Sequence, residues 1–223
     1  MIEKASPIRL FTSDNRPPRT KTEYVLESLR TSILLRHVKP GTRITEKHVQ
    51  DLLNVSSSPV REAFNQLEAE GLLVRRPHAG IKVTEIDVSD AKELHFVQSL
   101  LQGTSVEVSA SKLKEEDIAE AEKINDEIAE RVRREVNIDE IRILNYKFHL
   151  LVCGSNVYPW LARLLSSLWI RLPTSTIWSI PKEARVAIQF HKKILEAIKK
   201  RNARLAGALM KEHLERAMEI LFK

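Results

Sequence analysis

Apolar residues in the first third of the chain recur at helical spacing, in three short blocks separated by turn residues. The apolar positions are Val25, Leu29, Ile33 and Leu34 in the first block, Val49, Leu52 and Leu53 in the second, and Val60, Phe64 and Leu67 in the third. Pro40–Gly41 ends the first block, and Thr45 is placed to cap the second. The third block starts near Pro59 and ends at Gly71. This pattern predicts three short helices.

After Gly71 the pattern changes from helical to β-prone. Leu72–Arg75 and Ile81–Thr84 are short β-prone runs, and Pro77–Gly80 between them is typical of a turn, which predicts a β-hairpin. Three short helices followed by a hairpin describe a winged helix-turn-helix domain at residues 21–86. Residues 1–20 contain three prolines and several basic residues without periodicity. We expect a flexible basic arm there.

From Asp87 to the end, the apolar pattern is helical and no β-pattern returns. Turn residues divide this part into segments at 89–112, 115–135, 138–153, 157–172, 182–200 and 203–222. We therefore expect a mainly α protein, in which the winged helix is followed by an all-helical antiparallel bundle of about six helices at residues 87–223.

Composition narrows the class of protein. The chain is 43% hydrophobic and 30% charged, and its apolar runs are shorter than the roughly 18 residues that a membrane span requires. The first residues lack the apolar segment of a secretion signal. The single cysteine excludes an internal disulfide. These features predict a soluble protein of the cytoplasm without a membrane partner.

Basic charge is concentrated in the first domain. Residues 1–84 carry 14 Lys and Arg against 9 Asp and Glu, whereas the remaining residues carry 22 against 21. This asymmetry suggests that the first domain binds nucleic acid, with a contribution to solubility as the alternative that charge alone leaves open. In a helix-turn-helix the start of the second helix enters the major groove. The candidate DNA-binding residues are Lys47, Ser56, Ser57, Ser58, Arg61, Arg75, Arg76, His78 and Gly80. Helix capping by the serines and a surface pair between Arg61 and Glu62 are the structural alternatives.

Three histidines and an asparagine lie on helical patterns in the second domain. Asn145 and His149, four residues apart, stand about 6 Å apart along one helix, close enough to grip one ion. His191 and His213 lie on two further helices that antiparallel packing would bring together. Three imidazoles and one oxygen suit a divalent metal such as Zn²⁺ or Ni²⁺. Taken singly, each histidine is better explained by a structural role or by exposure at the surface. Cys153 could be a softer ligand, but a small buried residue is the better explanation.

The first domain contains five short sequence motifs. They are LR..I at Leu29–Ile33, PG..I.E at Pro40–Glu46, VS..PVREA at Val55–Ala63, L..EGL at Leu67–Leu72 and G..V at Gly80–Val83. Together they resemble the DNA-binding domain of the GntR family of bacterial transcription regulators. The resemblance implies a homodimer that binds a palindromic operator, with Ser56, Ser58 and Arg61 at the DNA. Ser57 stands where the family usually has an arginine, so no operator sequence is carried over.

The second domain carries further motifs: N..FH at Asn145–His149, H..IL.AI at His191–Ile198 and M..H at Met210–His213. They resemble the FadR-type effector domain called FCD. Many of its members bind a divalent metal, and the resemblance implies that His149, His191 and His213 are ligands. Asn145 stands where relatives have a metal-binding aspartate, so weaker metal binding is expected.

The resemblance also implies a pocket for a small-molecule effector, such as an organic acid. Gln98 and Gln102 stand where relatives commonly have arginine and glutamate, which argues against an ordinary dicarboxylate. Arg171 and Arg185 remain as anion partners. The predicted effector pocket therefore comprises these four residues.

Three functions are compatible with these patterns. The first is a ligand-responsive transcriptional regulator with a metal-containing sensor domain. The second is a metallo-hydrolase that uses three histidines and an open coordination position, although the chain lacks an HExxH motif. The third is a DNA-binding regulator whose sensor has lost its metal, as Asn145, Gln98 and Gln102 suggest. Metal content separates the first from the third.

Overall fold

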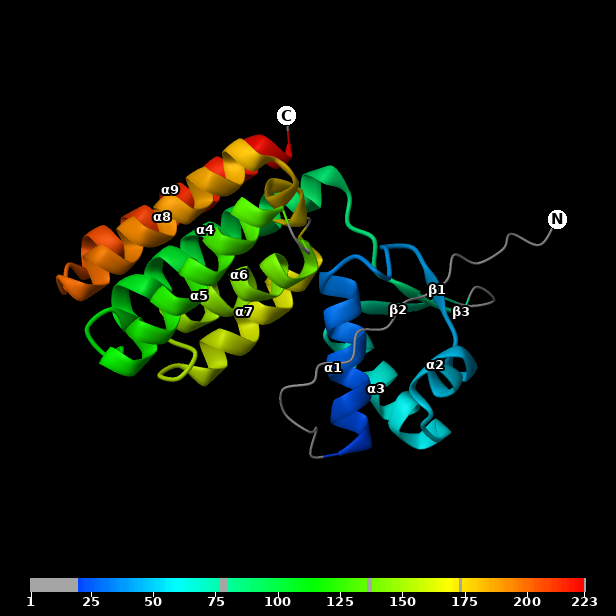
Figure 1. The fold of residues 1–223 in the computed structure, drawn as a ribbon. Coiled ribbons are helices and arrows are strands. Elements are labelled where there is room, and N and C mark those ends of the chain that lie inside the picture. The colour runs from blue at the N-terminus through cyan, green and yellow to red at the C-terminus, as the bar shows by residue number, and fades with distance from the viewer. Residues whose placement is uncertain (1–19, 77–79, 136–137, 173, 223) are drawn as a thin grey trace. The chain divides into compact units, whose positions relative to one another are not determined.

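The chain divides into two compact units at Ile86 and Asp87 (Figure 1). The computed structural model describes residues 20–76, 80–135, 138–172 and 174–222. The arm predicted at residues 1–20 lies outside this part except for Thr20, and His78 also lies outside it. Thr20 belongs to the first helix, because its hydroxyl caps that helix by accepting from the Glu23 backbone N–H at 3.1 Å.

The first unit contains three helices and a small sheet. In chain order, the elements are α1 (Lys21–Leu34), β1 (Arg43–Ile44), α2 (Glu46–Leu53), α3 (Ser57–Ala69), β2 (Leu73–Arg76) and β3 (Gly80–Val83). As predicted, Thr45 caps α2 by accepting from the His48 backbone N–H. Gly71, with φ of 68°, follows α3 in the left-handed conformation. The winged helix-turn-helix is confirmed.

Two details of the first unit differ from the prediction. The wing is a three-stranded antiparallel sheet in the order β1-β3-β2, with Arg43 opposite Lys82 and Leu73 opposite Val83. Strand β1 was not predicted, because a strand of two residues is too short to show an alternating pattern. Leu52 is 46% exposed and lies outside the core, whereas Val49 is fully buried.

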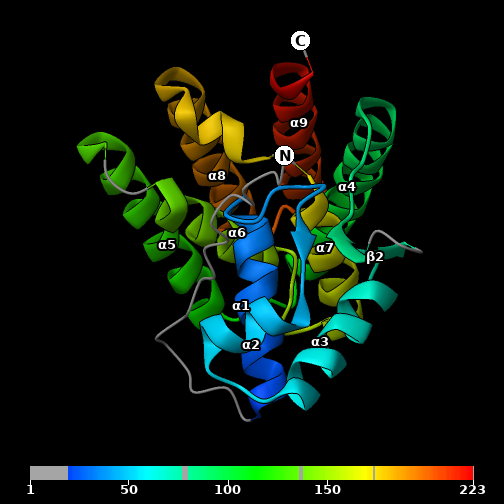
Figure 2. The same cartoon turned by 90° about the vertical axis from the view of Figure 1, so that its right-hand side faces the viewer.

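The second unit is a ring of six helices around a buried centre. They are α4 (Val88–Ser109), α5 (Glu115–Arg134), α6 (Ile138–Val152), α7 (Pro159–Arg171), α8 (Pro181–Lys199) and α9 (Ala203–Leu221), with a 3₁₀ turn, η1, at Thr174–Ser179. Around the ring, α4 packs on α9, α9 on α8, α8 on α5, α5 on α6, α6 on α7 and α7 on α4. Figure 2 shows α5, α8, α9 and α4 in this order. The predicted bundle is confirmed, and none of its described helices could cross a membrane.

Helix α4 has an inverted pattern of burial. Its buried residues are mainly polar: His95, Gln98, Ser99, Gln102, Ser105 and Ser109. Phe96, Leu100 and Val108 are exposed. A helix that packs by its apolar face would show the opposite arrangement. The buried polar face of α4 is therefore the first structural indication of a site inside the bundle.

Two glycines bring the backbones of α4 and α9 into contact. A Cβ atom built on Gly207 would lie 2.7 Å from the Gly103 carbonyl oxygen, and one on Gly103 would lie 3.2 Å from the Gly207 carbonyl oxygen. No side chain larger than hydrogen fits between them without movement. The crossing of these two helices is thus set by main-chain atoms.

Candidate functional site

The start of α3 presents three exposed serines. Ser56 occupies the N-cap position but makes no capping hydrogen bond from its side chain, while Ser57 and Ser58 lie in the first turn. Ser58 donates a hydrogen bond to Glu62 at 3.2 Å. Capping by the Ser56 side chain therefore does not explain why the helix begins with hydroxyl groups, and contact of these serines with a major groove stays a prediction.

Arg61 lies on the same exposed surface, one turn further along α3. Its Nε is 3.7 Å from a carboxylate oxygen of Glu46, not of Glu62, which instead accepts from Thr22 and Ser58. Lys47 on α2 lies 3.3 Å from Asp51. Exposed ion pairs of this kind contribute little to stability. Both cations can therefore exchange their carboxylate partners for phosphates or base edges at small cost.

The wing adds basic residues at the end of β2. Arg75 and Arg76 are exposed, and Arg75 Nε lies 3.4 Å from Glu68. Gly80 begins β3 with φ of 75°, and a Cβ there would lie 3.2 Å from Nε of Arg43. Arg43, on the strand that sequence reasoning missed, therefore places a further guanidinium beside the glycine of the wing.

In the second unit, three helices bring His149, His191 and His213 together at the centre of the bundle. His149 lies on α6, His191 on α8 and His213 on α9. One ring nitrogen of each lies within 4.8 Å of the other two, and their ring centroids are 5.0 to 5.3 Å apart. Nitrogens that share a zinc ion at about 2.1 Å stand at most about 4.2 Å apart. A small rotation of the side chains therefore suffices for coordination.

Burial keeps these imidazoles uncharged. Desolvation, with a smaller contribution from His213, holds the pKa of His149 and of His191 well below the usual 6.5. Desolvation, together with the neighbouring His95, lowers the pKa of His213 to about 4. Since a metal binds the neutral form of histidine, no proton has to be displaced from the three rings near neutral pH.

Other helices of the ring hold the histidines in place. Nδ1 of His149 lies 2.8 Å from Oε1 of Gln102 on α4, and Nδ1 of His191 lies 3.0 Å from Oδ1 of Asn125 on α5. The indole of Trp169 on α7 packs on His149 with ring centroids 4.5 Å apart. All six helices therefore contribute a side chain to this site.

A cavity beside the histidines offers unsatisfied polar atoms. It is lined by His95, Asn145, His149, Trp169, Ile177, Trp178, Ala187, His213, Leu214 and Ala217. Among the described residues that line it, Oδ1 of Asn145 and both ring nitrogens of His95 are buried without a hydrogen-bond partner. Nε2 of His191, which is not part of the lining, is in the same condition. Such groups are costly unless something binds them. The volume of about 20 Å³ admits an ion or a water molecule but not an organic acid in this conformation.

Comparison with known families follows the division of the chain. The description "Bacterial regulatory proteins, gntR family" applies to residues 21–83, and the FCD domain matches residues 93–216. The FCD match alone spans more than half of the chain. This chain belongs to the GntR family and carries an FCD domain. Proteins of these families are transcriptional regulators and not enzymes, so the metallo-hydrolase alternative falls away.

Individual relatives agree with this assignment. The GntR-family chain is 28% identical over 205 residues to the uncharacterized HTH-type transcriptional regulator YdhC of Bacillus subtilis, covering 90% of this chain and 92% of YdhC. It is 23% identical to the HTH-type transcriptional regulator McbR of Escherichia coli, covering 93% and 98%. The solved structure of E. coli McbR/YncC covers 91% of this chain and 97% of its own, with a TM-score of 0.82 and 23% identity. It shows the same fold.

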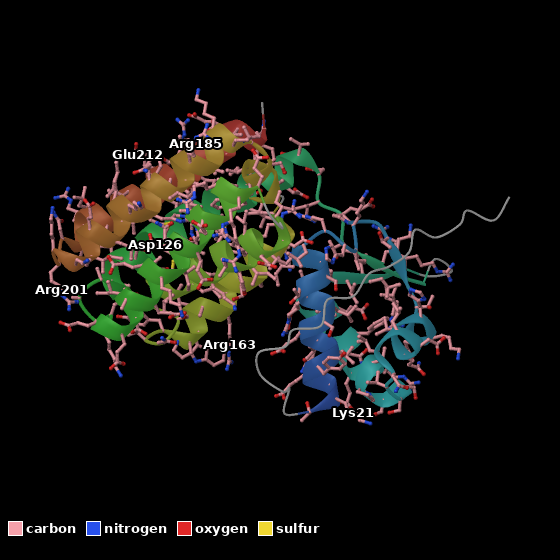
Figure 3. All side chains as sticks on the ribbon, viewed as in Figure 1. Lys21, Asp126, Arg163, Arg185, Arg201 and Glu212 are labelled. Atoms are coloured by element: carbon pink, nitrogen blue, oxygen red, sulfur yellow. The ribbon has the colours of Figure 1, made fainter. Side chains whose placement is uncertain are left out.

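The predicted effector residues of this GntR-family chain fall in two places. Gln98 and Gln102 are buried on α4, and Gln102 contacts the histidine cluster directly. Arg171, at the end of α7, is half-buried, whereas Arg185 is exposed on the outer side of α8 (Figure 3). Neither arginine lines the cavity described above. The role of these four residues as an effector pocket stays a prediction.

Sequence reasoning missed His95, Asn125 and the orienting role of Gln102 within this FCD domain. His95 is fully buried on α4, one turn before Gln98, and its position on the polar stripe of that helix was the available signal. Asn125 had none, because its partner lies 66 residues away. Cys153 is buried, lies outside the metal-binding group found among the described residues, and contacts Gln102 instead.

Proposed function

We propose that this GntR regulator binds a palindromic operator as a homodimer and that its FCD domain is a sensor containing a divalent metal at His149, His191 and His213. The observation that carries this proposal is the cluster of three buried, uncharged imidazoles within 4.8 Å of one another. Neutral nitrogen donors suit Zn²⁺ or Ni²⁺. Asn145, whose buried Oδ1 has no partner among the described residues, supplies a candidate oxygen ligand.

Effector binding follows from the same cavity. A metal held there would supply a Lewis acid for an anionic ligand atom, and His95, which also lines the cavity, offers a hydrogen-bonding group. Because the cavity has a volume of only about 20 Å³, a small organic acid requires movement of the surrounding helices. Such movement would couple effector binding to DNA binding by the winged helix-turn-helix domains. The coupling free energy in such systems is typically about 1–3 kcal/mol.

The homodimer is supported by the outer side of α4. Phe96 and Leu100, four residues apart, are 53% and 40% exposed, and Val108 further along is 44% exposed. Clustered apolar side chains on a surface are typical of an interface. A dimer would also supply the two recognition helices that a palindromic operator requires.

Metal loading is the direct test of the sensor. We expect purified protein to bind Zn²⁺ or Ni²⁺ in equilibrium dialysis, and a free metal concentration of 100 times Kd to stabilise it by about 2.7 kcal/mol. His191→Ala should abolish this stabilisation, because it removes one of three ligands. His48→Ala is the control, since His48 is exposed in the winged unit and its loss should leave metal binding intact.

A second candidate function, a regulator with a metal-free sensor, is favoured by the uncharged ligand set around Asn145. If the sensor is metal-free, the free energy of unfolding of the wild-type protein should not change when Zn²⁺ or Ni²⁺ is added. That result would contradict the metal-dependent sensor and would leave the DNA-binding function standing.

The DNA-reading surface is tested separately. Arg61→Ala is expected to weaken operator binding by about 1–3 kcal/mol and to relax specificity, because Arg61 is placed to contact base edges. Selection of bound genomic fragments would provide the operator, and fluorescence anisotropy at fixed salt would give the affinity. Lys47→Ala is the comparison: as a phosphate contact it should weaken binding to all sequences alike. Equal effects on specific and unrelated DNA would contradict the base-reading role of Arg61.

A further inference from the structure

The two hydrogen bonds that support the cluster both come from amide side chains. Oε1 of Gln102 lies 2.8 Å from Nδ1 of His149, and Oδ1 of Asn125 lies 3.0 Å from Nδ1 of His191. An amide oxygen only accepts a hydrogen bond. Nδ1 of each histidine must therefore carry its proton, and the lone pair of each neutral ring lies on Nε2.

Cys153 lies beside the same Gln102 oxygen that faces His149. Its Sγ lies 3.9 Å from Gln102 Oε1. Burial raises the pKa of the Cys153 thiol, which therefore stays protonated and acts as a donor. One oxygen can accept from both the thiol and an Nδ1–H imidazole, so the contact agrees with this tautomer of His149.

The nitrogen of His191 opposite its hydrogen bond to Asn125 is left for a ligand. Nε2 of His191 is fully buried and has no hydrogen-bond partner among the described residues. A buried lone pair that no donor satisfies is costly in the absence of a ligand. A cation satisfies the lone pairs of several rings at once.

The supporting amides carry no charge. Histidine ligands usually donate their second N–H to a carboxylate, a backbone carbonyl or water, and a carboxylate in this place increases the basicity of the ligand. Here the three histidines, Gln102, Asn125 and Asn145 are all uncharged near neutral pH, so a divalent ion would be buried without compensating negative charge. Such burial of charge is unfavourable. It lowers the affinity for the metal while leaving the arrangement of the three histidines unchanged.

We propose that Gln102 and Asn125 are the positioning residues of the metal site: they set the tautomers of His149 and His191 and, because they are amides, they keep the metal exchangeable. This inference rests on the proposed metal site. Its consequence for regulation is that occupancy of the sensor follows the supply of metal, instead of the metal being a permanent structural component.

The tautomers are measurable in the full-length wild-type protein. Long-range ¹H–¹⁵N correlation spectra of histidine-labelled, metal-free protein at neutral pH distinguish Nδ1–H from Nε2–H rings. We expect His149 and His191 to be Nδ1–H tautomers, and Gln102→Met to change the signal of His149 alone. An Nε2–H tautomer at either histidine in the wild type would overturn the positioning role. This measurement needs no variant, so it stands even if Gln102→Met does not fold.

Affinity for Zn²⁺, measured by competition with a fluorescent chelator, tests the role of charge. Gln102→Met and Asn125→Leu should weaken binding by about 10- to 100-fold, as losses of such supporting hydrogen bonds do. Gln102→Glu and Asn125→Asp should bind more tightly than wild type and release metal more slowly. Gln189→Glu is the matched control: it makes the same change of charge on α8, but at an exposed position, and should leave affinity unchanged.

The outcomes separate this inference from the proposed function. Zinc binding that is no tighter in Gln102→Glu and Asn125→Asp than in wild type would overturn the exchangeable site while leaving the metal site intact. Failure of wild type and of both carboxylate variants to bind zinc would overturn the metal site itself, and the exchangeable loading with it. The tautomers would still decide whether the amides position the rings.

Discussion

Acidification from pH 6.5 to about pH 4 is expected to destabilise the metal-free FCD domain by several kcal/mol. Burial lowers the pKa of His95 and of His213 from 6.5 to about 4 in the folded chain. Below pH 6.5 the unfolded chain binds protons that the folded chain excludes, so the free energy of unfolding falls with pH. Each of these two histidines costs about 3 kcal/mol once the pH reaches about 4. The lowered pKa values of His149 and His191 act in the same direction.

Urea unfolding in the presence of a chelator, followed by tryptophan fluorescence at pH values from 7.5 to 4, measures this loss. Trp160, Trp169 and Trp178 are the three tryptophans of the chain, so the signal reports the FCD domain alone. His95→Gln should make stability less dependent on pH, because it removes one titrating ring. A free energy of unfolding that stays constant between pH 7 and pH 5 would contradict this account of the buried histidines.

Phe148→Ala is expected to destabilise the FCD domain by about 3–5 kcal/mol, the usual cost of removing a large side chain from a packed core. Phe148 is fully buried, and its ring stacks on His191 with centroids 4.0 Å apart and an interplanar angle of 20°. The substitution therefore also removes a wall that holds His191 in place. Chemical unfolding measures the first effect, and zinc affinity measures the second.

Phe148→Leu is the matched control, because it retains most of the apolar volume but removes the aromatic ring. We expect a much smaller loss of stability than in Phe148→Ala. Comparing the zinc affinities of the two variants shows whether the core or the stacked ring matters more for His191. A Phe148→Ala protein as stable as wild type would mean that Phe148 is not a core residue.

Local patterns were sufficient to predict most helices of this GntR regulator. Apolar spacing, caps such as Thr45 and glycines such as Gly71 act over a few residues, and the elements they predict are present. The helix predicted at 157–172 begins at Pro159, where the ring is favoured in the first turn. The turn η1 was not predicted, because six residues of 3₁₀ helix carry no apolar period.

The inner side of α4 shows where sequence patterns stop being informative. Apolar spacing would place Phe96 and Leu100 inside, yet both are exposed, and Gln98 and Gln102 are buried instead. The inversion arises because α4 contributes polar groups to a site and not only apolar groups to a core. The histidines themselves were predictable by resemblance, but their hydrogen bonds to Gln102 and Asn125 join residues 47 and 66 positions apart. Such contacts depend on the tertiary arrangement.

The contact between Gly103 and Gly207 has a mechanical consequence. Side chains between two packed helices usually absorb small shifts of the helices, because they can change rotamer. At this crossing the two glycines leave little room for such side chains, because a Cβ on Gly207 would lie 2.7 Å from the Gly103 carbonyl oxygen. Helix α9 carries His213, and α4 is the helix with which the chain continues from the winged unit. The two glycines thus make the α4–α9 crossing a place where added side-chain volume would force one helix away from the other.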